Sequence, residues 1–315
     1  MRTSRSQQNA DIRRISRDQT LAGDGEVEEK SLYANFRLGA QYDNNVGAWP
    51  WDDAFVQAQN LDEDQDDWAA VANLALDWQR VSDSPWTFRA GYWLYADAHL
   101  SYDQYNLTGQ ALTLEPGYGQ GRISCRLPVS VNFSTEDNLT DSYGWSVQPT
   151  LALELAKNHS LEAWGAASQT GYQSPDSSLA GDDQDADTLG GGGGYLFLFS
   201  GGFFRLSGDW RTVEADGDNW DRESVLGAAV ARVPLGSRLA LTLSGVMEDV
   251  EYDNPHSFFN EARQDTIFTT SADLTFRAAG PWEFWLLYNF TRADSNLPLY
   301  EYDRHVIGAG LGMNL

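Results

Sequence analysis

The chain has 315 residues, a formal net charge of −25 and a pI near 4.3, so it offers no basic surface for nucleic acid. Aromatic residues make up 13% of it and include 12 Trp, yet the mean hydropathy is −0.46. No apolar run approaches the roughly 20 residues of a membrane helix, and the single cysteine, Cys125, excludes an intrachain disulfide. The strongest remaining signal is a two-residue alternation of apolar and polar side chains.

Residues 1–30 are polar, with arginines followed by carboxylates. They lack the apolar core of about 7–15 residues that a signal peptide needs, so the sequence is expected to be a mature form or part of a longer chain. We expect these residues to form a polar tail, disordered or periplasmic. Residues 31–315 form the second predicted unit.

The first alternating run sets Leu32, Phe36 and Leu38 against Arg37. Because side chains alternate across a strand, each such run has one apolar and one polar face. Similar runs recur to the end of the chain, at about residues 31–42, 68–79, 86–97, 104–115, 118–132, 142–156, 159–172, 185–200, 203–214, 220–233, 237–251, 268–277, 282–291 and 307–315.

The connections between these runs alternate in length. Short turns are expected after residues 79, 115, 156, 200, 233 and 277, the second of them at Pro116-Gly117, and longer acidic loops lie between. We therefore predict an all-β fold, a transmembrane up-and-down antiparallel β-barrel of about 14 strands. Its short turns would be periplasmic and its long acidic loops extracellular. A soluble sandwich or propeller would not keep large apolar residues on one face for so many strands.

Glycines fill residues 190–194. A phosphate-binding loop would also need a Gly-Lys-Ser/Thr ending, which is absent, so close backbone packing or a bend in the sheet is the preferred interpretation.

Two sets of residues follow from this register. Interface tryptophans suit the two headgroup levels of a bilayer; the predicted aromatic girdle is Trp68, Trp78, Trp86, Trp145, Trp210 and Trp282. Charged residues on the opposite face would line the lumen, either as a packed set of salt bridges or as a charged wall along a water path. These are Arg37, Arg89, Arg122, Arg126, Arg205, Arg211, Arg238, Arg277, Asp77, Asp97, Asp209, Asp273 and Glu283.

Carboxylates in two predicted outer loops offer hard oxygen ligands for Ca²⁺ or Mg²⁺, although such runs are more often solvated loop faces. They are Asp62, Glu63, Asp64, Asp66, Asp67, Asp182, Asp183, Asp185 and Asp187. No other cofactor is predicted. His99 and His305 lie near aspartates, but no catalytic spacing is recognisable, so we expect no catalytic residue and no enzymatic activity.

Three segments carry a family resemblance: residues 42–46 (Tyr-Asp-Asn-Asn-Val), 252–255 (Tyr-Asp-Asn-Pro) and 295–306 (Ser-Asn-Leu-Pro-Leu-Tyr-Glu-Tyr-Asp-Arg-His-Val). They resemble the C-terminal barrel of the surface lipoprotein assembly modifier (Slam-like) outer-membrane family, over about residues 31–315. The resemblance implies a barrel of similar strand number and a role in moving proteins to the cell surface.

The expected function is passage across the outer membrane of a Gram-negative bacterium, with protein or lipoprotein export as the leading hypothesis. A cation-preferring diffusion porin is the alternative, given the acidic mouth, and a structural or adhesive barrel with a filled lumen is a third. Large inward residues such as Trp93, Trp164 and Trp285 favour a narrow or filled bore. Expected partners are outer-membrane lipid and lipopolysaccharide, the barrel assembly machinery and an exported lipoprotein cargo.

Overall fold

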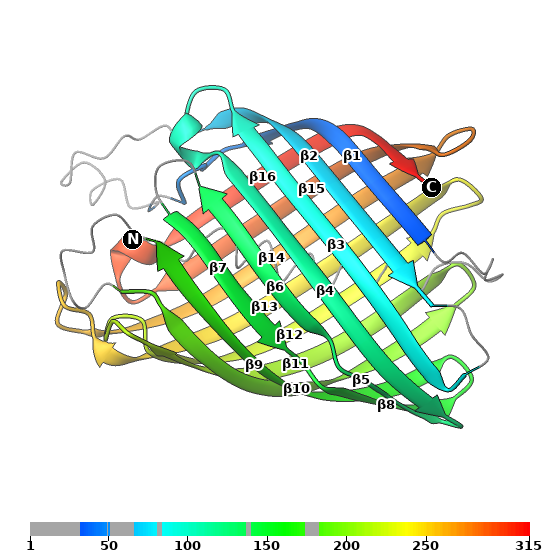
Figure 1. Cartoon of the computed structure of the whole chain (residues 1–315). Helices are drawn as coiled ribbons and strands as arrows, with labels where there is room; N and C mark the ends of the chain where they lie inside the picture. The colour runs from blue at the N-terminus through cyan, green and yellow to red at the C-terminus, as the bar shows by residue number, and fades with distance from the viewer. Residues whose placement is uncertain (1–31, 49, 51–65, 81–83, 137–139, 174–182) are drawn as a thin grey trace.

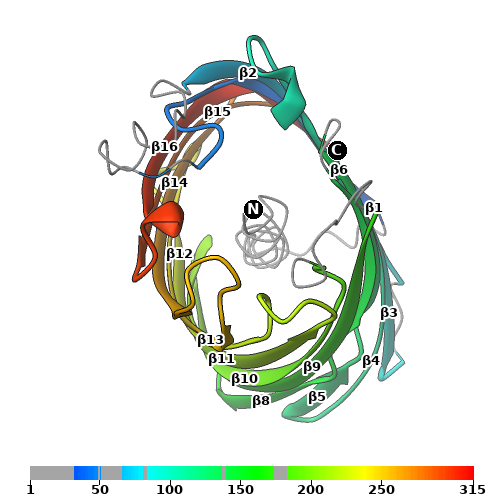
Figure 2. The same cartoon turned by 90° about the vertical axis from the view of Figure 1, so that its left-hand side faces the viewer.

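The computed structural model describes residues 32–48, 50, 66–80, 84–136, 140–173 and 183–315, so the predicted tail 1–30 lies outside the described residues. Sixteen strand segments form one antiparallel sheet that closes on itself (Figures 1 and 2). They are β1 (Leu32–Asp43), β2 (Asp67–Gln79), β3 (Trp86–His99), β4 (Leu107–Gln120), β5 (Ile123–Arg126), β6 (Val129–Glu136), β7 (Thr140–Val147), β8 (Thr150–Ala156), β9 (His159–Gln173), β10 (Ala186–Phe199), β11 (Gly202–Ala215), β12 (Arg222–Pro234), β13 (Leu239–Pro255), β14 (Ala262–Arg277), β15 (Trp282–Ser295) and β16 (Tyr302–Asn314).

Two pairs of segments are continuous across a short break. β5 and β6 both pair with β4 in one unbroken register, and β7 and β8 both pair with β9. The wall therefore has 14 barrel strands, as the alternation predicts. Each strand pairs with its neighbours along the chain, and β1 pairs with β16 to close the barrel.

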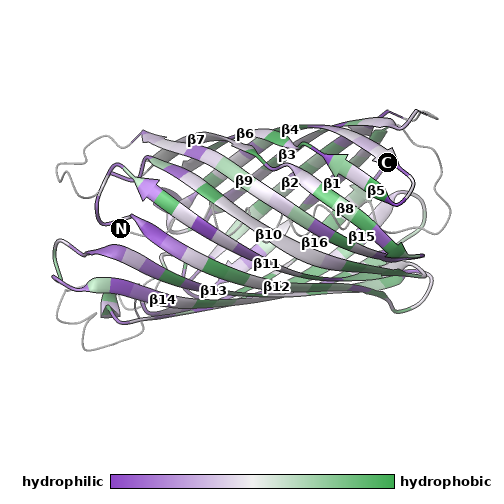
Figure 3. Ribbon diagram, turned by 90° about the horizontal axis from the view of Figure 1, so that it is seen from below, coloured by the Kyte–Doolittle hydropathy of each residue, from purple (hydrophilic) through white to green (hydrophobic). Residues whose placement is uncertain are grey.

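The alternation of side chains is retained in the closed sheet. Leu32, Phe36 and Leu38 are exposed on the outside of β1, whereas Arg37 is directed inward and bonded to neighbouring strands. Figure 3 shows hydrophobic residues along the strand bodies and hydrophilic residues gathered at the strand ends near the long loops. The exposed apolar belt is the surface that a barrel presents to lipid, while closure leaves no sheet edge there.

The described residues also include two short 3-10 helices, η1 (Asp103–Tyr105) and η2 (Pro298–Tyr300). Among the described residues, no helix is long and apolar enough to span a bilayer.

The turn predicted at Pro116-Gly117 is wrong. β4 runs through both residues to Gln120, and the chain reverses at residues 121–122, where Gly121 has a φ of +62°. A left-handed φ suits glycine, so the tight turn forms there. The outer connection after β6 is also shorter than expected, because β6 and β7 extend to Glu136 and Thr140.

Pro116 belongs to a row of three prolines in consecutive wall strands. Leu127 N donates to Pro116 O, Gln148 N to Pro128 O, and Gly165 N to Pro149 O. In an antiparallel hydrogen-bonded pair the second bond would come from the opposite N–H, which proline lacks. Each of these three strand interfaces therefore loses one ladder bond. Thr150 Oγ1 donates to Gln148 O at 3.2 Å and replaces one of them.

The glycine run of β10 provides space for a tryptophan. Gly192 lies directly opposite Trp164 of β9, and a Cβ on Gly192 would lie 2.8 Å from the Trp164 ring and 2.3 Å from Gly208 O. Inward glycines thus allow the indole to lie against the wall, which confirms the expected close packing.

The closing seam uses the same arrangement. The indole of Trp285 on β15 lies against Gly308 and Gly310 of β16 and Gly39 of β1. A Cβ on Gly310 would be 2.0 Å from Leu38 O and 2.7 Å from the Trp285 ring. The seam therefore depends on the absence of side chains beneath this indole.

We predict that Gly310→Ala destabilises the barrel, because the added methyl meets backbone that cannot move without separating β1 from β16. The expected cost is about 1–3 kcal/mol, as for other overpacked sites. It is measured as a lower urea midpoint of tryptophan fluorescence in detergent micelles. Gly245→Ala is the matched control, since its Cβ would have no neighbour within 4 Å. Equal midpoints for the two variants would contradict this account of the seam.

Candidate functional site

The first part of the site is an ion-pair network on the inner wall beside the seam. Arg37 of β1 crosses Gly312 of β16 to reach Glu283 of β15, Nε to Oε1 at 2.8 Å, and Asp273 of β14, Nη1 to Oδ2 at 2.7 Å. Gly312 is necessary for this path, because a Cβ there would be 2.8 Å from Glu283. One guanidinium thus connects four consecutive wall strands.

The two carboxylates of this network have further donors. Thr275 Oγ1 donates to Asp273 Oδ1 at 2.7 Å, and Asn314 Nδ2 donates to Glu283 Oε2. Glu283 is almost fully buried. Both acids therefore pair with Arg37 through one oxygen and accept a hydrogen bond from a neutral side chain on the other.

Two other lumenal groups are built similarly. Glu162 of β9 binds Arg126 of β5 at 2.7 Å and Arg205 of β11 at 2.9 Å, and Arg89 binds Asp77 at 2.8 Å. The Trp164 indole donates from Nε1 to Asp209 at 2.6 Å. Each of these contacts joins strands at most three places apart in the sheet. The charged side chains therefore bond along the wall.

The strand register places ten of the predicted lumenal residues on the inward face: Arg37, Arg89, Arg126, Arg205, Arg211, Asp77, Asp97, Asp209, Asp273 and Glu283. Arg277 shares that face as the last residue of β14. Arg122 and Arg238 were expected on strands, but they lie in the turns that precede β5 and β13 and are exposed. Both residues were misplaced because the predicted strands begin at residues 118 and 237, whereas β5 begins at Ile123 and β13 at Leu239.

The tryptophans chosen for the girdle all lie exposed on the outer face, with fractional exposures of 41–62%. Trp78, Trp86 and Trp282 sit at the short-turn ends of their strands, and Trp68 sits at the long-loop end of β2. Trp145 and Trp210 lie further inside β7 and β11.

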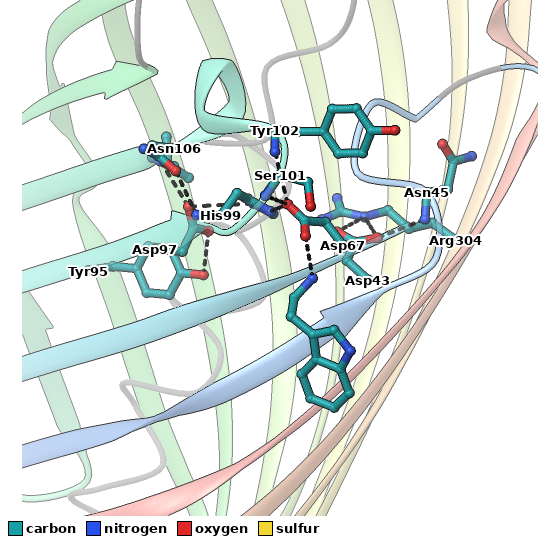
Figure 4. Close-up of polar contacts among 12 residues, drawn as sticks. Asp43, Asn45, Asp67, Tyr95, Asp97, His99, Ser101, Tyr102, Asn106 and Arg304 are labelled. Atoms are coloured by element: carbon teal, nitrogen blue, oxygen red, sulfur yellow. Dashed lines mark hydrogen bonds and ion pairs between the residues drawn. The ribbon is translucent and has the colours of Figure 1, made fainter. Parts of the chain in front are cut away.

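The second part of the site is the outer rim of the seam, shown in Figure 4. Arg304 of β16 grips the fully buried carboxylate of Asp43 through Nε and Nη2. Asn45 Nδ2 donates to Asp303 O at 3.0 Å, and His305 N donates to Asn44 Oδ1 at 2.6 Å. Residues 42–46 and 295–306, which carry the family resemblance, are thus direct neighbours.

The third resembling segment joins the same rim from β13. The Arg263 guanidinium lies over the Tyr300 ring at 3.4 Å and the Tyr252 ring at 4.6 Å, and it pairs with Asp265. His256 Nε2 is 2.9 Å from the Tyr300 hydroxyl. These contacts hold η2 against β13 and β14, so all three segments belong to one rim assembly.

Arg304 and Arg263 were missed among the predicted site residues. Arg304 has the inward parity of Val306 and Gly308, and Arg263 has that of Asp265 and Asp273. Extending the two-residue period past the expected strand starts would have found both.

Asp67, the first residue of β2, holds the loop of residues 100–106 next to this rim. Its carboxylate accepts the backbone N–H groups of Trp68, Ser101 and Tyr102 at 2.8–3.0 Å (Figure 4). Burial alone would raise the pKa of Asp67, but these donors outweigh it and hold the pKa below its ordinary value. Asp67 therefore stays negatively charged and holds the loop through these three hydrogen bonds.

His99 and Asp97 complete the loop support. The fully buried His99 ring lies between carboxylates, with Nδ1 3.5 Å from Asp67 and Nε2 3.8 Å from Asp97. Asp97 accepts from the Tyr95 hydroxyl and from Leu107 N, both at 2.8 Å. Asp97 thus sits at the outer end of the lumen and supports the loop above it.

Five of the nine carboxylates expected to bind divalent cations are among the described residues. Asp62, Glu63, Asp64 and Asp182 lie outside the described residues. Asp66 accepts from Tyr42, Asp183 from Asp185 N, and Asp185 from Tyr172 N. Asp187 is exposed on β10. In the described part of the chain, no group of three or more His, Cys, Asp or Glu side chains could hold a metal ion.

Two other histidines contact tyrosine hydroxyls. His159 Nδ1 is 2.6 Å from the Tyr195 hydroxyl and His305 Nδ1 is 2.9 Å from the Tyr288 hydroxyl, as for His256 and Tyr300. Cys125 is exposed on the outer face of β5.

Comparisons with known proteins bear on the fold. No family model and no curated protein matches the chain. The outer membrane channel DcaP of Acinetobacter baumannii is a structural neighbour at 13% identity and a TM-score of 0.50, over 93% of this chain and 100% of that one. Pseudomonas aeruginosa OprD (11%, 0.42, 94% and 98%) and Acinetobacter baumannii OccAB4 (10%, 0.45, 91% and 99%) are more distant in shape.

At such identities the likeness concerns the fold alone, and of these three only DcaP is similar enough in shape to bear on it. The closed 14-stranded wall and its exposed apolar belt agree with that likeness. The chain has the fold of an outer-membrane β-barrel.

We predict that Asp67→Ala loosens residues 100–106, because three backbone donors lose their acceptor. The expected result is faster chymotrypsin cleavage at Leu100, Tyr102 or Tyr105 in the folded barrel, read by mass spectrometry of the fragments. Asp66→Ala is the control, since Asp66 bonds only the Tyr42 side chain among the contacts described. In the wild type, cleavage of the same segment by pepsin, a protease that is active in acid, should rise only as acid protonates Asp67, below the ordinary aspartate pKa of about 3.9. Identical cleavage of both variants would refute this role.

Proposed function

We propose that the barrel is a channel for diffusion of small polar solutes across the outer membrane. The observation that carries this proposal is the direction of the lumenal ion pairs. All those described join strands close together in the sheet, and none connects opposite walls. Because these charged side chains pair along the wall, they leave the space around the barrel axis open to solute.

Barrel size supports the same function. Barrels of about 8 strands have an interior just wide enough for side chains to fill, whereas those of about 16–18 strands leave an aqueous channel. A wall of 14 strands is nearer the second class. The lumenal tryptophans also lie against glycines of the wall, as Trp285 and Trp164 do, which reduces their intrusion into the bore.

A preference for cations would come from the acidic outer loops rather than from the wall. We expect such loops to raise the local concentration of cations at the mouth, and the chain's net charge of −25 agrees with this. Along the described strands, by contrast, Arg37, Arg89, Arg126 and Arg205 compensate the carboxylates that they touch.

Protein or lipoprotein export is the second candidate, and the rim assembly is the observation that favours it. The segments that resemble the surface lipoprotein assembly modifier family meet at one place on the outer rim through Arg304–Asp43 and Arg263–Tyr300. An exporter would use such a rim to receive cargo. Lipopolysaccharide and the barrel assembly machinery remain proposed partners in either case.

The test is single-channel recording of the refolded chain in a planar bilayer, combined with thiol labelling. Cys125→Ala removes the native thiol, and Ser271→Cys then places a thiol on the inward face of β14. Ala272→Cys, one residue on, faces outward and is the matched control. We expect stable open steps from both variants. A water-soluble, negatively charged methanethiosulfonate reagent should lower their conductance in the Ser271→Cys protein alone.

Two results would reject the diffusion channel. A barrel that stays closed or only flickers would direct attention to export or to a filled lumen. Open steps insensitive to the reagent in both variants would show that current does not pass along the inner wall.

A further inference from the structure

Hydroxyl side chains form a row across five neighbouring strands of the inner wall. Thr113 of β4 lies directly opposite Ser130 of β6, which lies opposite Ser146 of β7. Ser146 lies opposite Ser168 of β9, and Ser168 lies opposite Thr188 of β10. Because neighbouring strands lie about 4.8 Å apart, this hydroxyl row spans on the order of 20 Å of the wall.

The wall around the hydroxyl row is uncharged. Every second residue, counted from the first, points inward in residues 109–113, 130–134, 142–146, 166–170 and 186–190. All of these inward residues are Gly, Ala, Ser, Thr or Asn. This part of the wall, the uncharged arc, therefore offers hydrogen bonds to a solute but no ionic partner.

The rest of the lumen is charged. Of the 14 barrel strands, the nine outside the uncharged arc each carry at least one charged inward residue, as Arg205 does on β11 and Asp77 on β2. Beside the arc itself, Arg126 and Glu162 lie nearer the short turns and pair with each other at 2.7 Å. Charged groups and the hydroxyl row therefore occupy different parts of the inner wall.

The hydroxyl groups of the arc can bond both to one another and to a solute. Thr113 Oγ1 and Ser130 Oγ are 2.7 Å apart, and nearer the outer mouth Ser134 Oγ and Ser142 Oγ are 2.6 Å apart. Each hydroxyl has one donor and two acceptor sites, so one bond between two of them uses fewer sites than the pair possesses. The arc thus suits a partner whose own groups both donate and accept.

An amide and an aromatic ring accompany the hydroxyl groups. Asn132 is exposed on the arc, and a Cβ on Gly144 would lie 3.3 Å from its Oδ1, so the amide lies over that glycine. At the edge of the arc, the ring of Trp93 on β3 would lie 3.5 Å from a Cβ on Gly109. This indole is parallel to the Tyr95 ring within 4°. A flat apolar face therefore borders a surface of neutral hydrogen-bonding groups.

We propose that the uncharged arc binds a neutral hydroxylated solute, a mono- or oligosaccharide, as it passes through the barrel. This inference rests on the proposed diffusion channel and names a solute class for it. Sugar hydroxyls donate and accept as the side chains of the hydroxyl row do, and the C–H face of a sugar ring suits the face of Trp93. A charged solute finds its ionic partners on the other strands, so the two kinds of solute follow different sides of one bore.

The direct test is binding of maltotriose to the full chain, measured by saturation-transfer NMR in micelles of a detergent without a sugar headgroup. The double variant Ser146→Ala, Ser168→Ala removes two central hydroxyls and adds no volume. It should raise the Kd about fivefold or more, as expected for two lost hydrogen bonds. The matched control is Ser244→Ala, Ser271→Ala, which changes two inward serines directly opposite each other on β13 and β14. The control should keep the wild-type Kd, and Trp93→Leu should raise it.

Polyethylene glycol of equal mass provides the comparison solute, because its ether oxygens accept hydrogen bonds but do not donate them. Equal transfer to both solutes would overturn the proposal. A Kd unchanged in the Ser146→Ala, Ser168→Ala protein, or raised equally in the matched control, would also overturn it, even if the channel conducts.

Single-channel recording separates this proposal from the diffusion channel. Maltotriose should lower the wild-type conductance saturably, and a higher concentration should be needed in the Ser146→Ala, Ser168→Ala protein. Maltotriose binding that depends on these serines in a barrel without conductance would keep the sugar site and reject the diffusion channel. Stable conductance without maltotriose binding would keep the channel and reject the sugar site.

Discussion

Closure of the sheet between β1 and β16 is the constraint on which this molecule depends. A bilayer does not hydrogen-bond a free strand edge, so the first and last strands must meet in register. The seam is secured at three levels: Arg304 with Asp43 at the outer rim, Trp285 over Gly39 and Gly310 further in, and Arg37 with Glu283 towards the short turns. Each level joins β1 to side chains of β14, β15 or β16.

One of these seam contacts also fixes charged groups on the inner wall. Arg37 serves the seam and also pairs with the two acids of β14 and β15 on the inner wall. The charged side chains of the inner wall are therefore paired with near neighbours in the sheet.

The sequence predicts the strands, their facing and the long-loop asymmetry, because lipid demands an alternation that is visible without coordinates. It misleads at Pro116-Gly117, where a typical turn pair sits inside β4. It also cannot show which inward groups meet. Arg37 reaches Asp273 only because residue 312 is glycine, and Asp43 meets Arg304 across 261 positions of chain. Such contacts depend on the stagger of the closed sheet, which the two-residue period leaves undetermined.

The row of prolines gives the wall unequal stiffness around its circumference. The interfaces from β4 to β9 each lack one cross-strand bond at Pro116, Pro128 or Pro149, whereas the seam lies on the other side of β2 and β3 with three sets of clasps. Because fewer hydrogen bonds join the strands along this diagonal than at the seam, we expect the wall to bend there first when lateral pressure in the membrane deforms the barrel.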